Sequence, residues 1–283
     1  MEMQNALNVF IKNALDEDIG EGDHSTLSTI DEGKQGMALL KIKDDGILAG
    51  MEFAEKIFKY KEHLCVFKAF KKDGDEMHFG EIAFEIKASI HTILQCERLV
   101  LNCMQRMSGI ATLTHQYVQK LKGFKTRLLD TRKTTPNFRL AEKEAVRIGG
   151  GMNHRFGLYD MIMLKDNHID YCGGIEKAID KAWHYIQDYK PGLLIEIETR
   201  SLDDVKKVIK TGKVNRIMLD NFSPVQIRAA LELINGHYET EASGGINLNN
   251  LADYAATGVD FISSGAIIHQ ARSLDLSLKA AIQ

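Results

Sequence analysis

The sequence predicts an α/β protein in which a small α+β domain precedes an α/β barrel or most of one. Three observations support this fold class. The chain has 283 residues, enough for one large or two ordinary domains with a substantial core. Apolar residues make up 44% and charged residues 27%, which is typical of a soluble globular protein. From residue 125 onward, short apolar strands alternate with helical segments at intervals of roughly 20 to 35 residues, the pattern of repeated βα units and a parallel sheet.

The bulk composition excludes several classes of protein. A formal net charge of -3 gives no reason to expect nucleic acid or an anionic membrane as partner. The four cysteines are scattered and contain no CxxC pair, so we expect reduced thiols in a cytoplasmic protein. The N-terminus is acidic and amphipathic, without the basic and apolar regions of a signal peptide. No run approaches the roughly 18 apolar residues of a membrane span.

The first part of the chain predicts mixed helices and strands. A helix at 1–18 is followed by a loop rich in Gly and Asp at 16–26 and by two short strands around the turn 44–46. The remaining elements are a helix at 51–61, strands at 64–70 and 81–88, and a long helical region at 88–123. Gly109 predicts a break in that helical region.

The second part predicts six strands with helices between most of them. The strands are expected at 126–130, 160–165, 193–198, 215–220, 237–242 and 259–264. The helices are expected at 140–148, 175–189, 201–212, 223–236 and 247–258. Six or more such strands suit a barrel or most of one. An open doubly wound sheet is the alternative, although no GxGxxG follows the first strand of the series.

Polar residues stand at the C-terminal end of every strand in this series. They are Asp130, Lys165, Glu198, Asp220, Glu241 and the pair Ser263 and Ser264. In a barrel of this kind the active site lies at the C-terminal ends of the strands. The register of these residues on otherwise apolar strands therefore favours a functional site over solvated loop starts.

The chemistry of these strand ends is mixed. The cations are Arg132, Lys133, His154, Arg155 and Lys165. Glu198 and Asp220 form an acidic pair, and "EASGGI" and "SSGAI" offer exposed backbone N–H groups that suit a phosphate. The pattern favours a pocket for a multiply anionic small molecule with a sugar phosphate, in which carboxylates bind hydroxyls or a divalent cation. Each piece alone also has a plain interpretation: a solvated turn, a flexible connector, or Glu196 or Glu198 paired with a neighbouring lysine.

Eight segments resemble a known family in their order along the chain. They are "ALDEDIGEGDHST", "CERLVLN", "DTRKTTPNFR", "GGGMNHRFGLYDMIMLKDNHI", "IEIET", "IMLDNF", "EASGGI" and "ISSGAI". In these segments the chain resembles the quinolinate phosphoribosyltransferases, the decarboxylating nicotinate-nucleotide pyrophosphorylases of NAD biosynthesis. The resemblance runs from about residue 14 to the end, and "DTRKT" and "NHRFGL…LKDNHI" are its most specific parts. It implies a sandwich-like α+β domain at 1–108, joined by 273–283, and an incomplete barrel of six or seven strands at 109–272.

The resemblance also implies a reaction. The ring nitrogen of quinolinate, a pyridine 2,3-dicarboxylate, attacks C1 of phosphoribosyl pyrophosphate, and pyrophosphate leaves. The 2-carboxylate is then lost as CO2, giving nicotinate mononucleotide. The protein's task in the first step would be positioning and electrostatic stabilisation.

The resemblance assigns expected roles to individual residues. Arg132 and Arg155 would hold the quinolinate carboxylates, with Thr131 and His154 as further donors, because Arg suits bidentate contact with a carboxylate. Lys133 and Lys165 would stand where the carboxylates meet the pyrophosphate. The remaining expected contacts are Glu198 and Asp220 with the ribose hydroxyls and Mg2+ carried by the pyrophosphate, directly or through water, and Ser243, Gly244, Gly245 and Gly265 with the 5'-phosphate. Thr134 and Thr135 are expected to shape the turn.

Arg98 lies outside the barrel in sequence. The resemblance implies that it enters the active site of a neighbouring subunit, so we expect a homodimer with shared active sites, or a higher oligomer built from it. The alternative for Arg98 is a surface residue paired with Glu97 or Asn102. Two functional alternatives also stay open. The first is a phosphoribosyltransferase for a monocarboxylate such as nicotinate, or a close paralogue that uses another pyridine or aromatic acid, and the second is a catalytically silent phosphosugar-binding regulator.

Overall fold

A computed structural model describes residues 2–281 of the chain, and the ends of our expected domain ranges at residues 1, 282 and 283 lie outside it. The chain folds into two compact units. Unit 1 comprises Met1–His115, Thr134–Gly150 and Ile268–Gln283, and unit 2 comprises Gln116–Lys133 and Gly151–Ile267. Residues 134–150, which we expected in the barrel, belong to unit 1. Each unit is therefore assembled from segments that are separated in the sequence.

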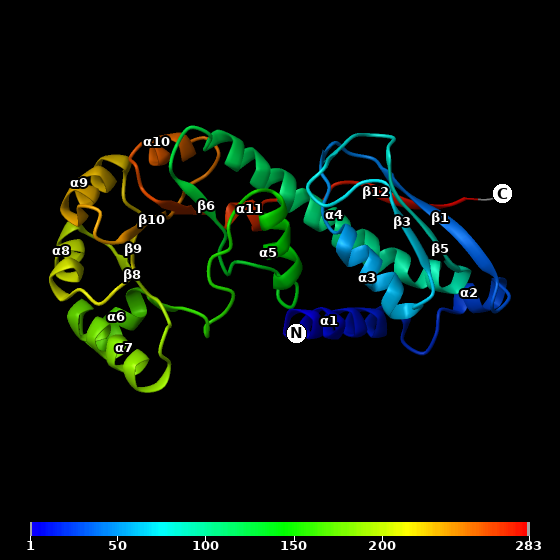
Figure 1. The fold of residues 1–283 in the computed structure, drawn as a ribbon, viewed down its shortest axis with the longest axis horizontal. Helices are drawn as coiled ribbons and strands as arrows, with labels where there is room; N and C mark the ends of the chain where they lie inside the picture. Colours follow the sequence, from blue (N-terminus) through cyan, green and yellow to red (C-terminus); the bar gives the residue numbers. More distant parts are fainter. Residues whose placement is uncertain (1, 282–283) are drawn as a thin grey trace. The chain divides into compact units, whose positions relative to one another are not determined.

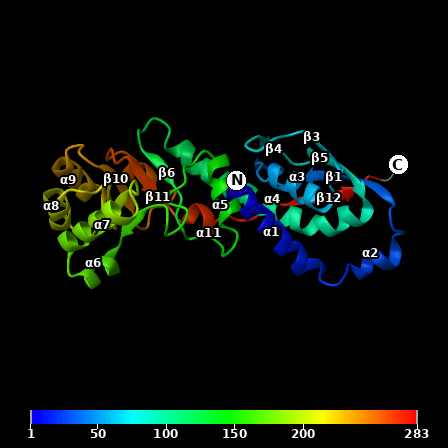
Figure 2. The same ribbon diagram turned by 60° about the horizontal axis from the view of Figure 1, so that its bottom comes forward.

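Unit 1 is built on a four-stranded antiparallel sheet. Its order is β12-β1-β5-β3, with β1 Gln35–Ile42, β3 Val66–Ala69, β5 Ile82–Ser89 and β12 Leu276–Ala280 (Figures 1 and 2). The C-terminal strand β12 thus lies beside β1. The turn at 44–46 does not make the hairpin its composition suggests, because β2 (Gly46–Ile47) pairs with β4 (Glu76–Met77) instead of β1.

Helices complete unit 1. They are α1 (Glu2–Ile19), α2 (His24–Thr29), α3 (Met51–Lys61) and α5 (Arg139–Ile148), together with most of α4 (Ile90–Lys120). Helix α3 buries Ile57 and Phe58 completely, and the Phe58 ring lies 6.2 Å from that of Phe84 on β5. Alternate residues of β1, such as Leu40 and Ile42, are buried as well. Apolar side chains with a helical and a two-residue spacing therefore meet in one core.

Helix α4 runs unbroken from Ile90 to Lys120, so the expected break at Gly109 is wrong. The glycine has a different purpose. A Cβ at this position would lie 1.9 Å from the carbonyl oxygen of Arg272, where the C-terminal segment passes the helix. Gly109 is therefore required by a close backbone approach rather than by a change of direction. The expected domain boundary at 108/109 falls inside this helix.

Unit 2 is an open barrel of six parallel strands. The strand order is β6-β11-β10-β9-β8-β7, with β6 Arg127–Leu129, β7 Ile162–Leu164, β8 Ile195–Thr199, β9 Arg216–Asp220, β10 Glu239–Ser243 and β11 Phe261–Ser263. Each strand lies beside the next one in the chain, except that β6 pairs with β11 and not with β7. A doubly wound sheet would reverse its order at a switch point within the sheet, and this sheet does not. The barrel alternative is therefore the correct one.

Helices cover the outside of this sheet (Figure 1). They are α6 (Asp166–Cys172), α7 (Ile175–Tyr189), α8 (Leu202–Thr211), α9 (Pro224–Ile234) and α10 (Leu251–Ala255), and the short α11 (Ala266–His269) follows β11. Because helices pack outside and side chains fill the inside, strands such as β8 are buried at every position. Among residues 2–281, no helix is long and apolar enough to cross a membrane.

Candidate active site

A cavity of about 280 Å³ opens at the C-terminal ends of the strands in unit 2. Seven of the residues expected at the site line it: Thr131, Arg132, Lys133, His154, Arg155, Lys165 and Ser243. The other lining residues are Asp130, Met163, Met218, Glu241 and Ser263. The parallel strands therefore bring together residues from β6 to β11, which are far apart in the sequence.

The guanidinium groups of Arg132 and Arg155 both line this cavity, and their positive charges repel each other. Burial lowers the pKa of Arg155, and the positive charge of Arg132 lowers it further. The Nε atom of Arg132 is buried and finds no hydrogen-bond partner within residues 2–281. Arg155 donates through Nη1 to the carbonyl oxygen of Met161, 3.2 Å away. Partly buried cations that repel one another, one of them with an unpaired donor, form a site that a bound anion would stabilise.

Lys165 connects the cationic and acidic parts of the site. It follows β7, and its Nζ lies 2.8 Å from Oε2 of Glu198, which is buried on β8. Asp220 ends the next strand, β9. Burial and the neighbouring charge of Glu198 raise the pKa of Asp220, so the two carboxylates sense each other. Such an oxygen-rich pair suits a hard divalent cation or sugar hydroxyls.

The backbone after β10 adopts conformations that favour glycine. Gly244 and Gly245 have φ angles of 98° and 64°. A Cβ on Gly244 would lie 2.2 Å from Oδ1 of Asn221, whereas a Cβ on Gly245 would meet nothing within 4 Å. Gly244 is thus required by packing, and Gly245 leaves its backbone open, as a phosphate site would need. Gly265 lies between β11 and α11 at the end of the adjacent strand.

The segment that links β6 to α5 holds structural contacts as well as site residues. Thr135 donates to Glu142 through both its backbone N–H (2.8 Å) and its hydroxyl (2.9 Å). Thr134 accepts from Nε of Arg139 at 3.0 Å. Both threonines therefore make contacts that shape this segment, as we expected. Arg98 is an exposed residue of α4 in unit 1, and its expected role in a neighbouring subunit stays a prediction.

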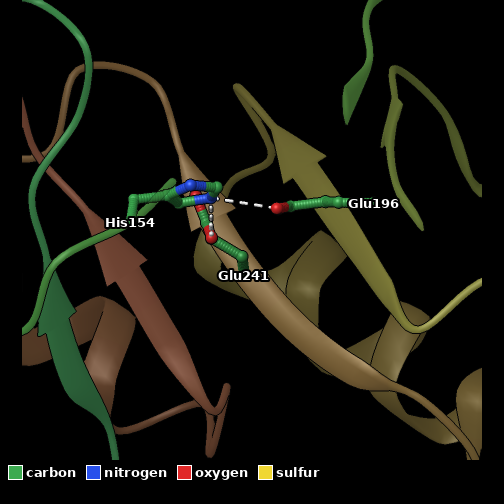
Figure 3. Close-up of side chains that lie close together, drawn as sticks. All are labelled: His154, Glu196 and Glu241. Atoms are coloured by element: carbon green, nitrogen blue, oxygen red, sulfur yellow. Dashed lines mark ion pairs between the residues drawn. The ribbon is translucent and has the colours of Figure 1, made fainter. Parts of the chain in front are cut away.

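A buried cluster of charges lies at the inner end of the cavity. His154 is directed toward Glu196 of β8 and Glu241 of β10 (Figure 3). Its Nε2 lies 2.9 Å from Oε2 of Glu196 and 3.2 Å from Oε2 of Glu241. Both glutamates have no exposed side-chain surface. Glu196 therefore pairs with a histidine, and the lysine pairing expected for one of the two glutamates of β8 is found at Glu198.

Arg216, the first residue of β9, completes this cluster. Its Nη1 lies 3.3 Å from Oε2 of Glu241 and 3.9 Å from Oε2 of Glu196, while Nη2 reaches Glu239 at 2.9 Å. The guanidinium also lies over the ring of Phe261, 4.2 Å from its centroid. The Arg216 guanidinium and the His154 ring thus both face the two buried carboxylates, and buried charge is tolerated when it has such partners.

The two ring nitrogens of His154 face protein groups. Nδ1 accepts a hydrogen bond from the backbone N–H of Arg155 at 2.7 Å, so the ring proton lies on Nε2, toward the carboxylates. Burial alone would lower the pKa of His154, and Glu196 and Glu241 outweigh it and raise the pKa, but the contact at Nδ1 leaves the ring in the neutral form with its proton on Nε2. Burial, followed by the charge of Glu241, raises the pKa of Glu196 to about 7. A direct contact of His154 with substrate would require the ring to turn.

Sequence reasoning assigned Glu196 and Glu241 no role in binding and did not single out Arg216. The available signal was weak. Glu196 and Glu198 alternate in "IEIE" and so face the same side of β8, and Glu241 stands between Thr240 and Ala242 on a buried strand. Charged residues inside apolar parallel strands indicate partners in the barrel interior, but the partners come from strands that are adjacent only after folding.

Comparisons with known proteins cover both parts of the chain. Residues 23–108 match the family model of the quinolinate phosphoribosyl transferase N-terminal domain, and residues 110–279 match that of the C-terminal domain. Nicotinate-nucleotide pyrophosphorylase (carboxylating), chloroplastic, from Arabidopsis thaliana is 41% identical over 96% of this chain and 82% of its own length. A probable nicotinate-nucleotide pyrophosphorylase (carboxylating) from Bacillus subtilis is 41% identical, covering 94% and 90%.

A solved structure shows the same fold. The crystal structure of NadC from Streptococcus pyogenes matches with a TM-score of 0.88 and 40% sequence identity, over 96% of each chain. The fold of this chain, with its antiparallel sheet and its six-stranded parallel sheet, is thus that of a known protein family.

Proposed function

Because the chain belongs to the quinolinate phosphoribosyltransferase family, we propose that it transfers the phosphoribosyl group of phosphoribosyl pyrophosphate to quinolinate and decarboxylates the product. The products are nicotinate mononucleotide, pyrophosphate and CO2. The observation that carries this proposal is the pair of guanidinium groups, Arg132 and Arg155, in one cavity. A planar dicarboxylate supplies the two negative groups that such a pair requires.

The residues that line the cavity could bind different groups of the pyridine dicarboxylate. Arg132 presents a buried Nε without a partner in the described chain, and Arg155 enters the same cavity from the next segment. Thr131 lines the cavity beside them, and its hydroxyl already accepts from the Lys133 backbone N–H at 3.0 Å. The guanidinium groups would hold the two carboxylates, with Thr131 as an additional polar contact. This arrangement favours a dicarboxylate over a monocarboxylate such as nicotinate, for which one of these cations would stay uncompensated.

Phosphoribosyl pyrophosphate would be bound by the acidic pair, Glu198 and Asp220, and by the backbone of the glycine-containing loops. Glu198 and Asp220 would bind the ribose hydroxyls and the Mg2+ that accompanies the pyrophosphate, and their paired carboxylates fit such a cation. Ser243, Gly244, Gly245 and Gly265 would surround the 5'-phosphate with backbone N–H groups. Bound there, Mg2+ would neutralise charge on the leaving group.

Lys133 and Lys165 would bring the two anionic substrates together. Both line the cavity. Quinolinate and phosphoribosyl pyrophosphate are both anions, and two ammonium groups would reduce the repulsion as the pyridine nitrogen approaches C1 of the ribose. Lys165 already contacts Glu198, so the same ammonium couples the carboxylate site to the ribose site. Loss of CO2 then requires little from the protein, since the pyridinium nitrogen stabilises the carbanion at C2.

We propose further that the enzyme acts as a homodimer in the cytoplasm. Arg98, exposed on α4, would complete the dicarboxylate site of the partner subunit. Two-fold symmetry would make one interface serve two sites. The cytoplasmic location is supported by the unpaired cysteines of the chain, of which Cys65, Cys96 and Cys103 are buried.

Incubation with quinolinate, phosphoribosyl pyrophosphate and Mg2+ tests the proposed reaction. Nicotinate mononucleotide and CO2 should appear in equal amounts, and neither should form without Mg2+. Nicotinate in place of quinolinate is the matched control. Turnover of nicotinate with none of quinolinate would show a monocarboxylate enzyme instead, and tight binding of both substrates without turnover would favour a regulator.

A further inference from the structure

We propose that Glu241 is a positioning residue for the dicarboxylate site: it holds His154, and His154 in turn fixes the backbone from which Arg155 enters the cavity. This inference rests on the proposed function, because it concerns the cavity that would bind quinolinate. It gives a role to a strand-end carboxylate that the proposed reaction leaves unexplained.

The contacts form a continuous path from the barrel interior to the cavity. Oε2 of Glu241 lies 3.2 Å from Nε2 of His154, and Nδ1 of the same ring accepts from the backbone N–H of Arg155 at 2.7 Å. The backbone N–H of His154 donates to Oδ1 of the fully buried Asp130 at 2.8 Å. The 154–155 peptide is therefore held at the side chain of His154 and at two successive backbone N–H groups. Such restraint is what the geometry of a binding guanidinium requires.

Glu241 is a carboxylate in a cavity that would bind an anion, so its position needs a physical explanation. Glu241 lines the cavity, has no exposed side-chain surface, and would repel a dicarboxylate if its charge were uncompensated. Arg216 and His154 lie within 3.3 Å of the same Oε2 atom and balance it. Glu241 therefore acts as an internal partner for Arg216 and His154 rather than as a contact for the substrate.

A metal ion is the other occupant that a histidine and two carboxylates suggest, since the ligand atoms of His154, Glu196 and Glu241 lie within 4.8 Å of one another. Arg216 argues against it. Its guanidinium already lies 3.3 Å from Glu241 and 3.9 Å from Glu196, and a divalent ion beside it would face a fixed positive charge. The Arg216 guanidinium thus provides positive charge where a metal would bring it.

The substitution Glu241→Gln, which keeps the shape and removes the charge, tests the proposal. We expect the Kd for quinolinate to rise about 10- to 100-fold, because small displacements of a positioning group cost that much. The Kd for phosphoribosyl pyrophosphate should change less than about 3-fold, because the path from Glu241 through His154 leads to Arg155 and not to the groups that would hold this substrate. Glu239→Gln is the matched control: Glu239 lies on the same strand and contacts the same Arg216, but its side chain is 53% exposed. It should leave both constants unchanged.

A double-mutant cycle with Arg155→Ala separates positioning from general damage. If Glu241 acts through Arg155, Glu241→Gln should weaken quinolinate binding little or not at all once the Arg155 guanidinium is gone. Additive effects, or equal weakening of both ligands, would overturn the proposal. Should Glu241→Gln not fold, as judged by circular dichroism, Arg216→Lys enters the same cycle, because it keeps the charge and removes the fork that joins Glu239 to Glu241.

The wild-type protein distinguishes this inference from the proposed function. If the wild type converts quinolinate and Glu241→Gln binds it normally, only the positioning role is wrong. If the wild type neither binds nor converts quinolinate, the proposed function itself fails, and the inference fails with it.

Discussion

At the scale of single residues, the site is a balance between cations that are compensated by the protein and cations that are not. Lys165 is paired with Glu198, and Arg216 with Glu239 and Glu241. Arg132, in contrast, keeps a buried Nε without a partner within residues 2–281. Arg132 and its neighbour Arg155 are therefore the cations that a substrate anion would neutralise, and substitutions there should affect binding first.

We predict that Arg132→Ala or Arg155→Ala weakens quinolinate binding far more than binding of phosphoribosyl pyrophosphate. Each removes a charged hydrogen-bonding fork from a partly desolvated anion, a loss of about 1.5–3 kcal/mol or roughly 10- to 150-fold. Calorimetric titration with each ligand measures the two effects separately. Equal weakening of both ligands, or of the second alone, would show that the guanidinium groups do not bind the carboxylates.

Asp220→Asn should separate catalysis from binding. The change keeps the size of the side chain and removes the charge that would serve the metal or the cation developing on the ribose, so turnover should fall by roughly 10- to 1000-fold. The Mg2+ concentration needed for half-maximal rate should rise, while quinolinate binding stays near normal. Asp203→Asn, at a side chain 79% exposed on α8, is the control. A rate unchanged at every Mg2+ concentration would refute the role of Asp220.

The sequence predicted those site residues that follow a strand directly or lie in a motif beside one. It did not predict the residues whose contacts come from strands that are distant in the sequence. Arg132, Arg155 and Lys165 directly follow predicted strands or lie in the motif beside them, and all line the cavity. Glu196 and Glu241 occupy β8 and β10, which are separated by β9, and His154 comes from a loop. No spacing along the chain encodes that meeting, which follows from the curvature of the sheet.

At the scale of secondary-structure elements, the same distinction explains the errors in the fold. Every strand of the parallel sheet begins within its predicted range and ends no more than about one residue beyond it, because apolar runs between helices have few other solutions. The predicted break in α4 was wrong because a glycine in a helix is compatible either with a bend or with the close approach of another segment. Only the path of the C-terminal segment past Gly109 decides between them.

Gly109→Ala tests that explanation by the sign of its effect. In an exposed helix, alanine in place of glycine stabilises by up to about 1 kcal/mol. Here the new Cβ would lie 1.9 Å from the carbonyl oxygen of Arg272, a backbone atom that cannot move away alone. We expect a loss of about 1–3 kcal/mol in the free energy of unfolding, measured by urea titration. A stabilised variant would contradict the close approach.

Asp260 should make the pairing of β10 and β11 sensitive to pH. Its carboxylate accepts from the backbone N–H of Thr240 at 3.0 Å and from the Thr240 hydroxyl at 2.7 Å, and Lys125 lies 3.0 Å away. Burial would raise the pKa of Asp260, but these contacts outweigh it and lower the pKa. The pKa of this carboxyl is about 4 in the unfolded chain and lower in the folded protein, so the ionised Asp260 stabilises the fold at pH values above about 4. This stabilisation is lost as the pH falls through the folded pKa.

The stability difference between wild type and Asp260→Asn should therefore be largest near neutral pH and shrink in acid. It should amount to about 1 kcal/mol or less, because solvent screens a carboxylate that is 35% exposed. Urea unfolding at several pH values measures it. A difference that grows as the pH falls would contradict the lowered pKa.

At the scale of the whole molecule, the chain combines a cationic cavity in unit 2 with an exposed arginine on α4 that the proposed reaction assigns to a partner. Arg98 is separated in sequence from every residue that lines the cavity, and its helix carries more apolar positions than one narrow stripe requires. If two chains exchange this arginine by two-fold symmetry, each active site needs both subunits.

Mixing two inactive variants tests the shared site. Arg98→Ala and Lys133→Ala would each be inactive as homodimers, because every site lacks one cation. In a heterodimer one site holds both defects and the other holds neither. Random exchange makes half of all dimers heterodimers, so up to roughly a quarter of wild-type sites should reappear. Exchange is verified with differently tagged chains, and each variant incubated alone is the control. Verified exchange without recovered turnover, or a fully active monomer, would show that each chain completes its own site.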